Sequence, residues 1–205
     1  ADAGGKNNMA ENQSRAGKPF GEIMMKNSPI CMAPRELAEV CQKKKIVVLV
    51  SRNDKENSEY AAEVCECVKQ DNSNDILYFS LKLKSDEFKS LHPELTVEVN
   101  DTPALSIDEL ENIEKSRNNS SKMSMIVIND LWLMAIQNTY TTKKEEIEEI
   151  LSKIKQLVEQ EKITVLALVL LSKYAPNNYS LRKEIESYEN FLRWADLIVK
   201  SSSEI

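Results

Sequence analysis

Short apolar runs alternate along the chain with segments whose apolar residues recur at helical spacing. The predicted strands cover residues 46–50, 76–79, 95–99, 125–128, 163–171 and 195–199. Most of these runs lack polar alternation, which is typical of parallel strands buried on both faces. The chain is therefore expected to contain a buried sheet whose strands are separated by long connections.

Helical spacing appears between these strands. Predicted helices lie near residues 34–42, from Ser58 to about residue 68, from Ser106 onward, over 147–158 and near 180–193. Ser106-x-x-Glu109 has the form of a capping box. Because strands alternate with helices, the pattern predicts right-handed crossovers and an α/β fold: a mainly parallel sheet with helices on both faces.

Three segments differ in composition. Residues 1–33 are rich in Gly, Asn, Lys and Met without sustained periodicity, which favours a flexible arm or linker. Residues 34–45 predict a linker helix that starts at Pro34 and ends in the lysines of residues 43–45. Residues 46–205 then form one domain, long enough to bury a core of its own.

Composition excludes several classes of function. The net charge is −6, so no general basic footprint for nucleic acid exists, although residues 43–45 with Lys18 and Lys26 leave a weak DNA contact open. The four cysteines and the single His92 have no metal-ligand spacing, which predicts reduced thiols and no metal. The sequence shows neither a membrane span nor a signal peptide, so we expect a cytoplasmic protein without membrane contact.

The connection after the first predicted strand is the most informative segment. An α/β nucleotide-binding protein carries a glycine-rich phosphate loop there. Residues 51–58 read S-R-N-D-K-E-N-S, which has no glycine and carries two acids. Asn57 stands directly before Ser58, at the place of the usual lysine. The alternatives are an atypical nucleotide site, in which Lys55 serves as phosphate ligand, and an ordinary surface loop, which we favour.

The order of motifs resembles the C-terminal, RecA-like ATPase domain of DnaB-type hexameric replicative helicases. Residues 76–81 (I-L-Y-F-S-L) are similar to the strand of that family ending F-S-L-E-M. Residues 97–110 resemble its D-D-T-P segment, and 126–134 (I-V-I-N-D-L-W-L-M) its Walker B strand. Residues 145–173 and 195–198 (A-D-L-I) match its later helix and strands. The resemblance implies a RecA-like three-layer sandwich, and in active members ATP and magnesium.

The positions that differ from the family pattern are those that bind nucleotide or take part in catalysis in active members. Of the phosphate loop, Arg52 and the hydroxyl of Ser58 remain, whereas its glycine is Glu56 and its lysine is Asn57. The glycine lets backbone amides close on phosphates and the lysine offsets their charge. Glu56 and Asp54 would instead repel a triphosphate.

Further replacements fall on neighbouring strand ends. The catalytic glutamate of the family aligns with Lys82, the Walker B aspartate with Asn129 and a sensor glutamine with Leu170. Asp130 is adjacent, but strand alternation predicts that it points to the opposite face. For Asn129 and Asp130 we favour strand-end capping over metal binding, and for Lys82 a solvated or ion-paired lysine.

These departures predict a catalytically inactive, helicase-like pseudo-ATPase without cofactor, metal or catalytic residues. Its vestigial nucleotide site comprises Ser51, Arg52, Lys55, Asn57, Ser58, Lys82, Asn129 and Asp130. It would act through a protein partner: a helicase-like or other replication protein, or a second copy, contacted through the N-terminal arm and the Pro34 helix. The alternatives are a divergent active helicase or NTPase that uses ATP and magnesium, and a structural domain outside replication. Trp132 and Trp194 fit core packing better than a partner surface.

Overall fold

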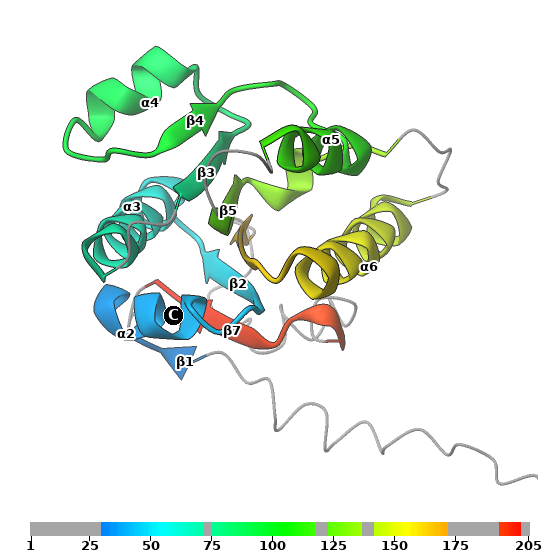
Figure 1. Cartoon of the computed structure of the whole chain (residues 1–205), viewed down its shortest axis with the longest axis horizontal. Coiled ribbons are helices and arrows are strands. Elements are labelled where there is room, and N and C mark those ends of the chain that lie inside the picture. The colour runs from blue at the N-terminus through cyan, green and yellow to red at the C-terminus, as the bar shows by residue number, and fades with distance from the viewer. Residues whose placement is uncertain (1–29, 72–74, 118–122, 137–141, 172–192, 202–205) are drawn as a thin grey trace, which may run out of the picture.

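The computed structural model describes residues 30–71, 75–117, 123–136, 142–171 and 193–201 (Figure 1). Residues 1–29 of the predicted arm (1–33) and nearly all of the predicted helix near 180–193 lie outside the described residues. Everything that follows concerns the described part of the chain.

A parallel sheet forms the centre of the molecule. Its strands are β1 (Ile30–Cys31), β2 (Ile46–Ser51), β3 (Asp75–Ser80), β4 (Glu98–Asn100), β5 (Met123–Asn129), β6 (Thr164–Leu170) and β7 (Leu197–Lys200). They lie in the order β1-β7-β2-β6-β5-β3-β4, and every described pairing is parallel. All of the strands predicted from apolar runs are present, with bounds shifted by a few residues.

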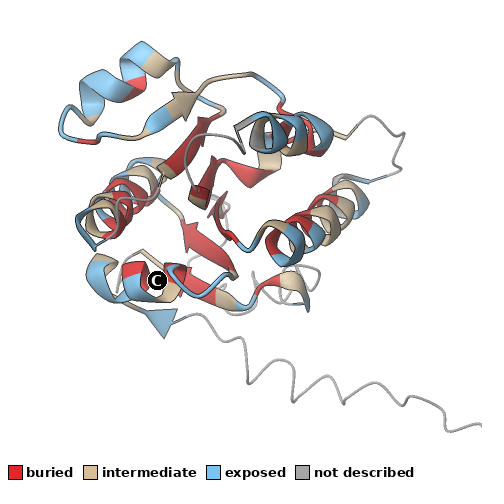
Figure 2. Cartoon of the chain, in the orientation of Figure 1, coloured by how far each residue is buried: buried red, intermediate tan, exposed pale blue. Residues whose placement is uncertain are grey.

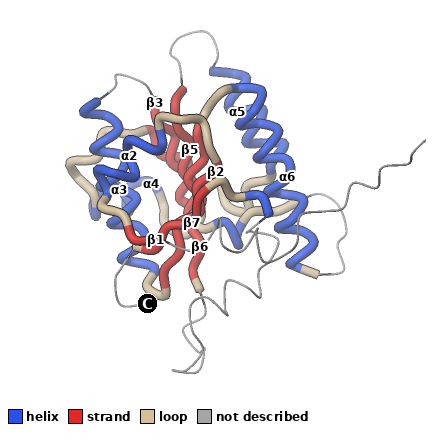
Figure 3. The backbone as a smooth tube through the Cα atoms, turned by 90° about the horizontal axis from the view of Figure 1, so that it is seen from below, coloured by secondary structure: helices blue, strands red, loops and turns tan. Residues whose placement is uncertain are grey.

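Helices cover both faces of this sheet. They are α2 (Pro34–Cys41), α3 (Asp54–Asp71), α4 (Ser85–Leu91), α5 (Ile107–Arg117) and α6 (Lys143–Glu161), with a short 3-10 helix, η1 (Leu131–Leu133). Figure 3 shows α2, α3 and α4 on one side of the strands and α5 and α6 on the other. The predicted three-layer α/β sandwich is thereby confirmed.

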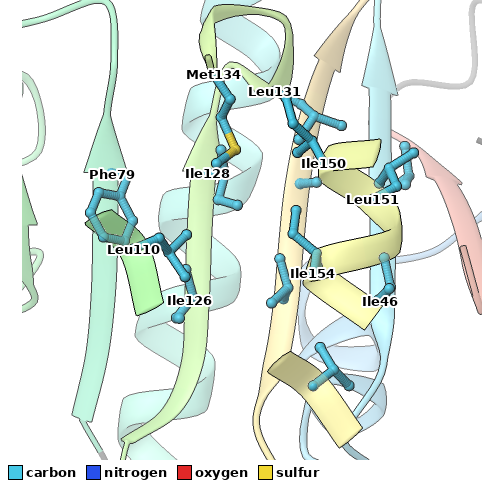
Figure 4. Close-up of a cluster of buried hydrophobic side chains, with 14 of the residues drawn as sticks. Ile46, Phe79, Leu110, Ile126, Ile128, Leu131, Met134, Ile150, Leu151 and Ile154 are labelled. Atoms are coloured by element: carbon cyan, nitrogen blue, oxygen red, sulfur yellow. The ribbon is translucent and has the colours of Figure 1, made fainter. Parts of the chain in front are cut away.

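The sheet separates two apolar cores because successive side chains of a strand point to opposite faces. On β2, Val47 and Leu49 pack toward α2 and α3, whereas Val48 and Val50 pack toward α6. The central strands β2, β3, β5 and β6 are buried at nearly every position (Figure 2), which explains their mostly apolar sequence. Figure 4 shows the α5–α6 side, where Leu110 lies near Phe79 and Ile150 of α6 belongs to the same apolar cluster as the strand residues.

Local capping starts the two helices on that side. The Ser106 amide donates to Glu109 Oε2 at 2.8 Å and the Glu109 amide donates to Ser106 Oγ at 3.2 Å, so the predicted capping box is confirmed. Thr142 and Glu145 form a second capping box at the start of α6. Each box satisfies amides that the first turn of a helix leaves without intrahelical acceptors.

The N-terminal side of the described chain is integrated into the domain. Ile30 and Cys31 form a short edge strand beside β7, within the segment predicted to be a flexible arm. Helix α2 begins at Pro34 and buries Leu37, Ala38 and Cys41 against α3 and the sheet. Its apolar stripe is thus occupied within the chain, so the expected contact of this helix with a partner stays a prediction for its exposed face.

Candidate functional site

The residues of the predicted vestigial site lie at or just after the carboxyl ends of the central strands, along one edge of the sheet. Ser80 of β3 is in register with Asn129 of β5, and Ser51 of β2 is in register with Leu170 of β6. Ligands of open parallel sheets bind at this edge. The geometry of the segments that leave it therefore decides what the site can hold.

The segment between β2 and α3 is much shorter than predicted. Strand β2 ends at Ser51 and helix α3 begins at Asp54, so only Arg52 and Asn53 connect them. The expected loop over residues 51–58 with a helix starting near Ser58 is wrong. The helix extends by a turn toward the strand because the segment lacks glycine and begins with Asn53 and Asp54, which suit a helix start.

Backbone amides in this short connection are already engaged. The Asn53 amide donates to Ser51 Oγ at 2.9 Å, and the Lys55 amide donates to Asn53 Oδ1 at 3.1 Å. The Asn57 amide donates to the Asn53 carbonyl at 3.1 Å as part of the helix. These three amides are satisfied by acceptors within the chain, whereas the amides of a phosphate-binding loop donate to the bound phosphate.

Asn57 occupies a core position near the start of α3. The residue is 1% exposed, and its Nδ2 donates to the carbonyls of Val169, at 3.3 Å, and Leu49, at 3.5 Å. The Oδ1 atom of Asn57 has no hydrogen-bond partner among the described residues. A lysine at this position would direct its ammonium group toward the sheet rather than toward a phosphate.

Ser58 and Asn129 are in direct contact. Asn129 Nδ2 donates to Ser58 Oγ at 2.9 Å and to the hydroxyl of Tyr78 at 3.2 Å. In active P-loop enzymes the equivalent hydroxyl and a Walker B aspartate hold magnesium together. Asn129 contacts the Ser58 hydroxyl directly, and its amide contributes no negative charge.

Lys82 links two acids across the same edge. Its ammonium group lies 2.6 Å from Asp54 Oδ1 on α3 and 3.2 Å from Asp130 Oδ2 after β5. Burial acts to lower the pKa of Lys82, but the hydrogen bonds and charges of Asp54 and Asp130 outweigh it and the pKa is raised. Burial raises the pKa of Asp130, which the Trp132 amide and Lys82 only partly offset.

Asp130 does not point to the opposite face as strand alternation predicted. Strand β5 ends at Asn129, so the alternation stops one residue before Asp130. Asp130 instead caps η1, where its Oδ1 accepts from the Trp132 amide at 3.1 Å, and its other oxygen reaches Lys82.

The remaining predicted residues lie at the rim. The side chain of Lys55 is 81% exposed and its ammonium group pairs with Glu59 at 3.5 Å. Arg52 is half-buried in the short connection. Sequence reasoning missed Tyr78, whose buried hydroxyl contacts Asn129. A phenol inside an otherwise apolar strand was the available signal, because a buried hydroxyl requires a partner.

The residues at this edge do not fit a nucleoside triphosphate with magnesium. A phosphate chain requires converging amides and cations, whereas Asp54 and Asp130 place two acids beside the connection and hold the Lys82 ammonium group between them. Among the described residues, no group of His, Cys, Asp and Glu side chains is arranged to hold a metal ion.

Lys82→Met is expected to lower the free energy of unfolding by about 1–2 kcal/mol near pH 7, a value reduced for the partial exposure of the pair. Without the cation, the Asp130 carboxylate is poorly compensated. An acid whose pKa is raised by folding binds its proton more tightly in the folded state, so its ionisation costs stability as pH rises. The deficit should therefore shrink as the pH is lowered to about 4, because without Lys82 burial raises the pKa of Asp130 further and a protonated Asp130 no longer needs the cation.

Urea unfolding at both pH values measures this effect. Lys84→Met removes a lysine of the same loop and should change stability by less than about 0.5 kcal/mol. An equal deficit for Lys82→Met at both pH values would contradict the role assigned to Asp130.

Comparison with known proteins identifies the class of this domain. Residues 82–183 match the family model of the DnaB-like helicase C-terminal domain. The chain is therefore related to the C-terminal domain of replicative helicases of the DnaB type, and the resemblance seen in its sequence is confirmed.

Solved structures show the same fold. One solved ATPase domain superposes with a TM-score of 0.61 at 14% identity, covering 87% of this chain and 78% of that one. A DnaB-like replicative helicase, solved to describe its interactions with primase, superposes with a TM-score of 0.57 at 14% identity, covering 75% of this chain. The match spans about half, 48%, of that helicase. The fold is RecA-like, as predicted.

One further comparison and one property of the helices complete the description. None of the curated protein sequences compared with the chain matches it. Within the described residues, no helix has both the length and the apolar character that crossing a membrane requires.

Proposed function

We propose that this domain is a non-catalytic relative of the helicase ATPase domain and acts by binding a protein of the replication machinery. The observation that carries the proposal is the short connection between β2 and α3. Asn53 and Asp54 begin the helix where a phosphate loop would surround its ligand, and the amides of Asn53, Lys55 and Asn57 are engaged within the chain.

The charges around the connection support the same proposal. Lys82 stands where the family places a catalytic carboxylate, and its ammonium group is held by Asp54 and Asp130. Asn129 replaces the Walker B carboxylate while keeping its contact with Ser58. A site that had lost only one group could regain it from a partner subunit. Several replacements around one edge favour a retained fold without its reaction.

Isothermal titration calorimetry with ATP and magnesium tests the proposal that the domain is non-catalytic and does not bind nucleotide. We expect no binding heat, because the domain lacks converging donors and presents acids to the phosphates. An active DnaB-type helicase titrated under the same conditions provides the positive control. Tight, magnesium-dependent binding by this chain would overturn the proposal and favour the divergent NTPase.

Sedimentation velocity tests the proposal that the domain binds a protein of the replication machinery. Helicase-like proteins, other replication proteins such as primase, and a second copy of the chain are the partners to compare. The related helicase was itself solved to describe its interactions with primase. A complex with a replication protein is the expected result. Failure to form one with any of them would favour a structural domain outside replication.

A further inference from the structure

A cleft lies beside the short connection, between the first two turns of α3 and helix α4. Its volume is about 530 Å³. Openings of this size accommodate a small molecule or a few side chains of a peptide. The walls differ in chemistry: α3 contributes polar and charged residues, whereas Leu83, Leu91 and His92 line the side of α4.

The α4 wall presents apolar surface to solvent. Leu91, the last residue of α4, is 62% exposed, more than any other large apolar side chain that the structure describes as exposed. Leu83 is partly buried against the core, and the His92 ring lies 4.9 Å from the Phe88 ring. Phe88 is buried, so this wall is anchored to the domain and its apolar surface is held in place. Such a surface at a cleft is typical of a protein contact.

The α3 wall carries an excess of acids. Asp54 and Glu59 line the cleft against a single Lys55, and Glu56 and Glu63 lie on the same first turns of α3 outside the lining. The pair between Lys55 and Glu59 joins side chains that are 81% and 52% exposed, and such pairs contribute little and exchange readily. Lys82 does not neutralise Glu59, because Asp54 and Asp130 bind its ammonium group.

We propose that this cleft binds a short segment of a partner protein in which an apolar side chain lies next to a lysine or arginine. The apolar side chain would pack on Leu83 and Leu91, and the cation would pair with Glu59. This inference rests on the proposed function, because it assigns the partner surface of a domain that binds protein in place of nucleotide. The acids exclude a phosphate backbone as occupant, since like charges repel.

Fluorescence anisotropy with a labelled peptide of alternating Lys and Leu residues provides the test. We expect this probe to bind, whereas a peptide of the same length with Glu in place of Lys should not. Leu91→Ser and Glu59→Lys should each weaken binding about tenfold, the effect of losing one packing or charge contact worth about 1.4 kcal/mol.

Two matched control variants distinguish binding of the peptide in the cleft from nonspecific hydrophobic or electrostatic binding elsewhere on the domain. Ile30→Ser removes an exposed apolar side chain at the opposite edge of the sheet, and Glu159→Lys makes the same charge change on α6. Both should bind the probe as the unaltered chain does. Equal weakening by these controls, or no binding at all, would overturn the assignment of the cleft.

The outcome is independent of the test of nucleotide binding. If the peptide does not bind, the assignment of the cleft as a peptide-binding site is wrong. The prediction that the domain does not bind ATP is unaffected, because calorimetry tests it separately. Self-association of the chain that Leu91→Ser abolishes would also overturn the assignment, because the occupant would then be a second copy.

Discussion

Asn57→Lys, which introduces the lysine that the family resemblance implies at this position, is expected to cost at least about 3 kcal/mol of unfolding free energy. Asn57 is 1% exposed and its amide nitrogen contacts backbone carbonyls of β2 and β6. A longer, charged side chain there would be buried without a counter-ion. In a phosphate loop the same lysine would lie in an open segment and would be tolerated.

Urea unfolding measures this loss of stability. Two further variants separate the effect of the buried charge from the effect of the lost hydrogen bonds. Asn57→Ala removes the same hydrogen bonds without adding charge and should cost about 1 kcal/mol, because the partnerless Oδ1 disappears with the donor. Lys55→Asn, on the exposed first turn, should be nearly neutral. A stable Asn57→Lys protein that binds ATP would show that the connection can still open into a phosphate loop.

Leu37→Ala is expected to lower the free energy of unfolding by about 3 kcal/mol, typical of a leucine removed from a packed core. Leu37 is 0% exposed on α2, where it belongs to the same apolar cluster as Val64 and Leu168. Tyr60 donates to the Met32 carbonyl at 2.7 Å, and Thr164 donates to the Cys41 carbonyl, so α2 is also held at both ends.

Chemical denaturation at several protein concentrations completes this test. Glu39→Ala changes an exposed residue of the same helix and should have little effect. If α2 packed on a neighbouring subunit, the midpoint would rise with protein concentration, because association stabilises the folded state by mass action. We expect no such dependence, since α2 packs within its own chain.

The strands were predictable because a buried parallel strand needs apolar residues at every position. The run at residues 125–128 therefore located β5, and the capping box at Ser106 located the start of α5. Helix α4 escaped detection because it is short and buries only Phe88, which leaves no periodic pattern. Strand β1 contributes only Ile30 and Cys31, both exposed, and depends on pairing with β7.

The residues of the predicted vestigial site could be named from the sequence, but their contacts could not. Lys82 was recognisable as a substitution for an acid, whereas its pairs with Asp54 and Asp130 join three segments that are distant along the chain. Asn129 reaches Ser58 for the same reason. Such pairings depend on which strand ends lie side by side, which a single sequence does not specify.

The amino-acid sequence by itself determined the fold class and the glycine-free composition of the predicted loop over residues 51–58, because burial patterns and residue chemistry are local properties. Only the tertiary structure decided what replaced that loop. Helix α3 begins at Asp54 and turns Asn57 toward the carbonyls of β2 and β6. That orientation depends on packing between a helix and the sheet beneath it, an interaction between residues far apart in the chain.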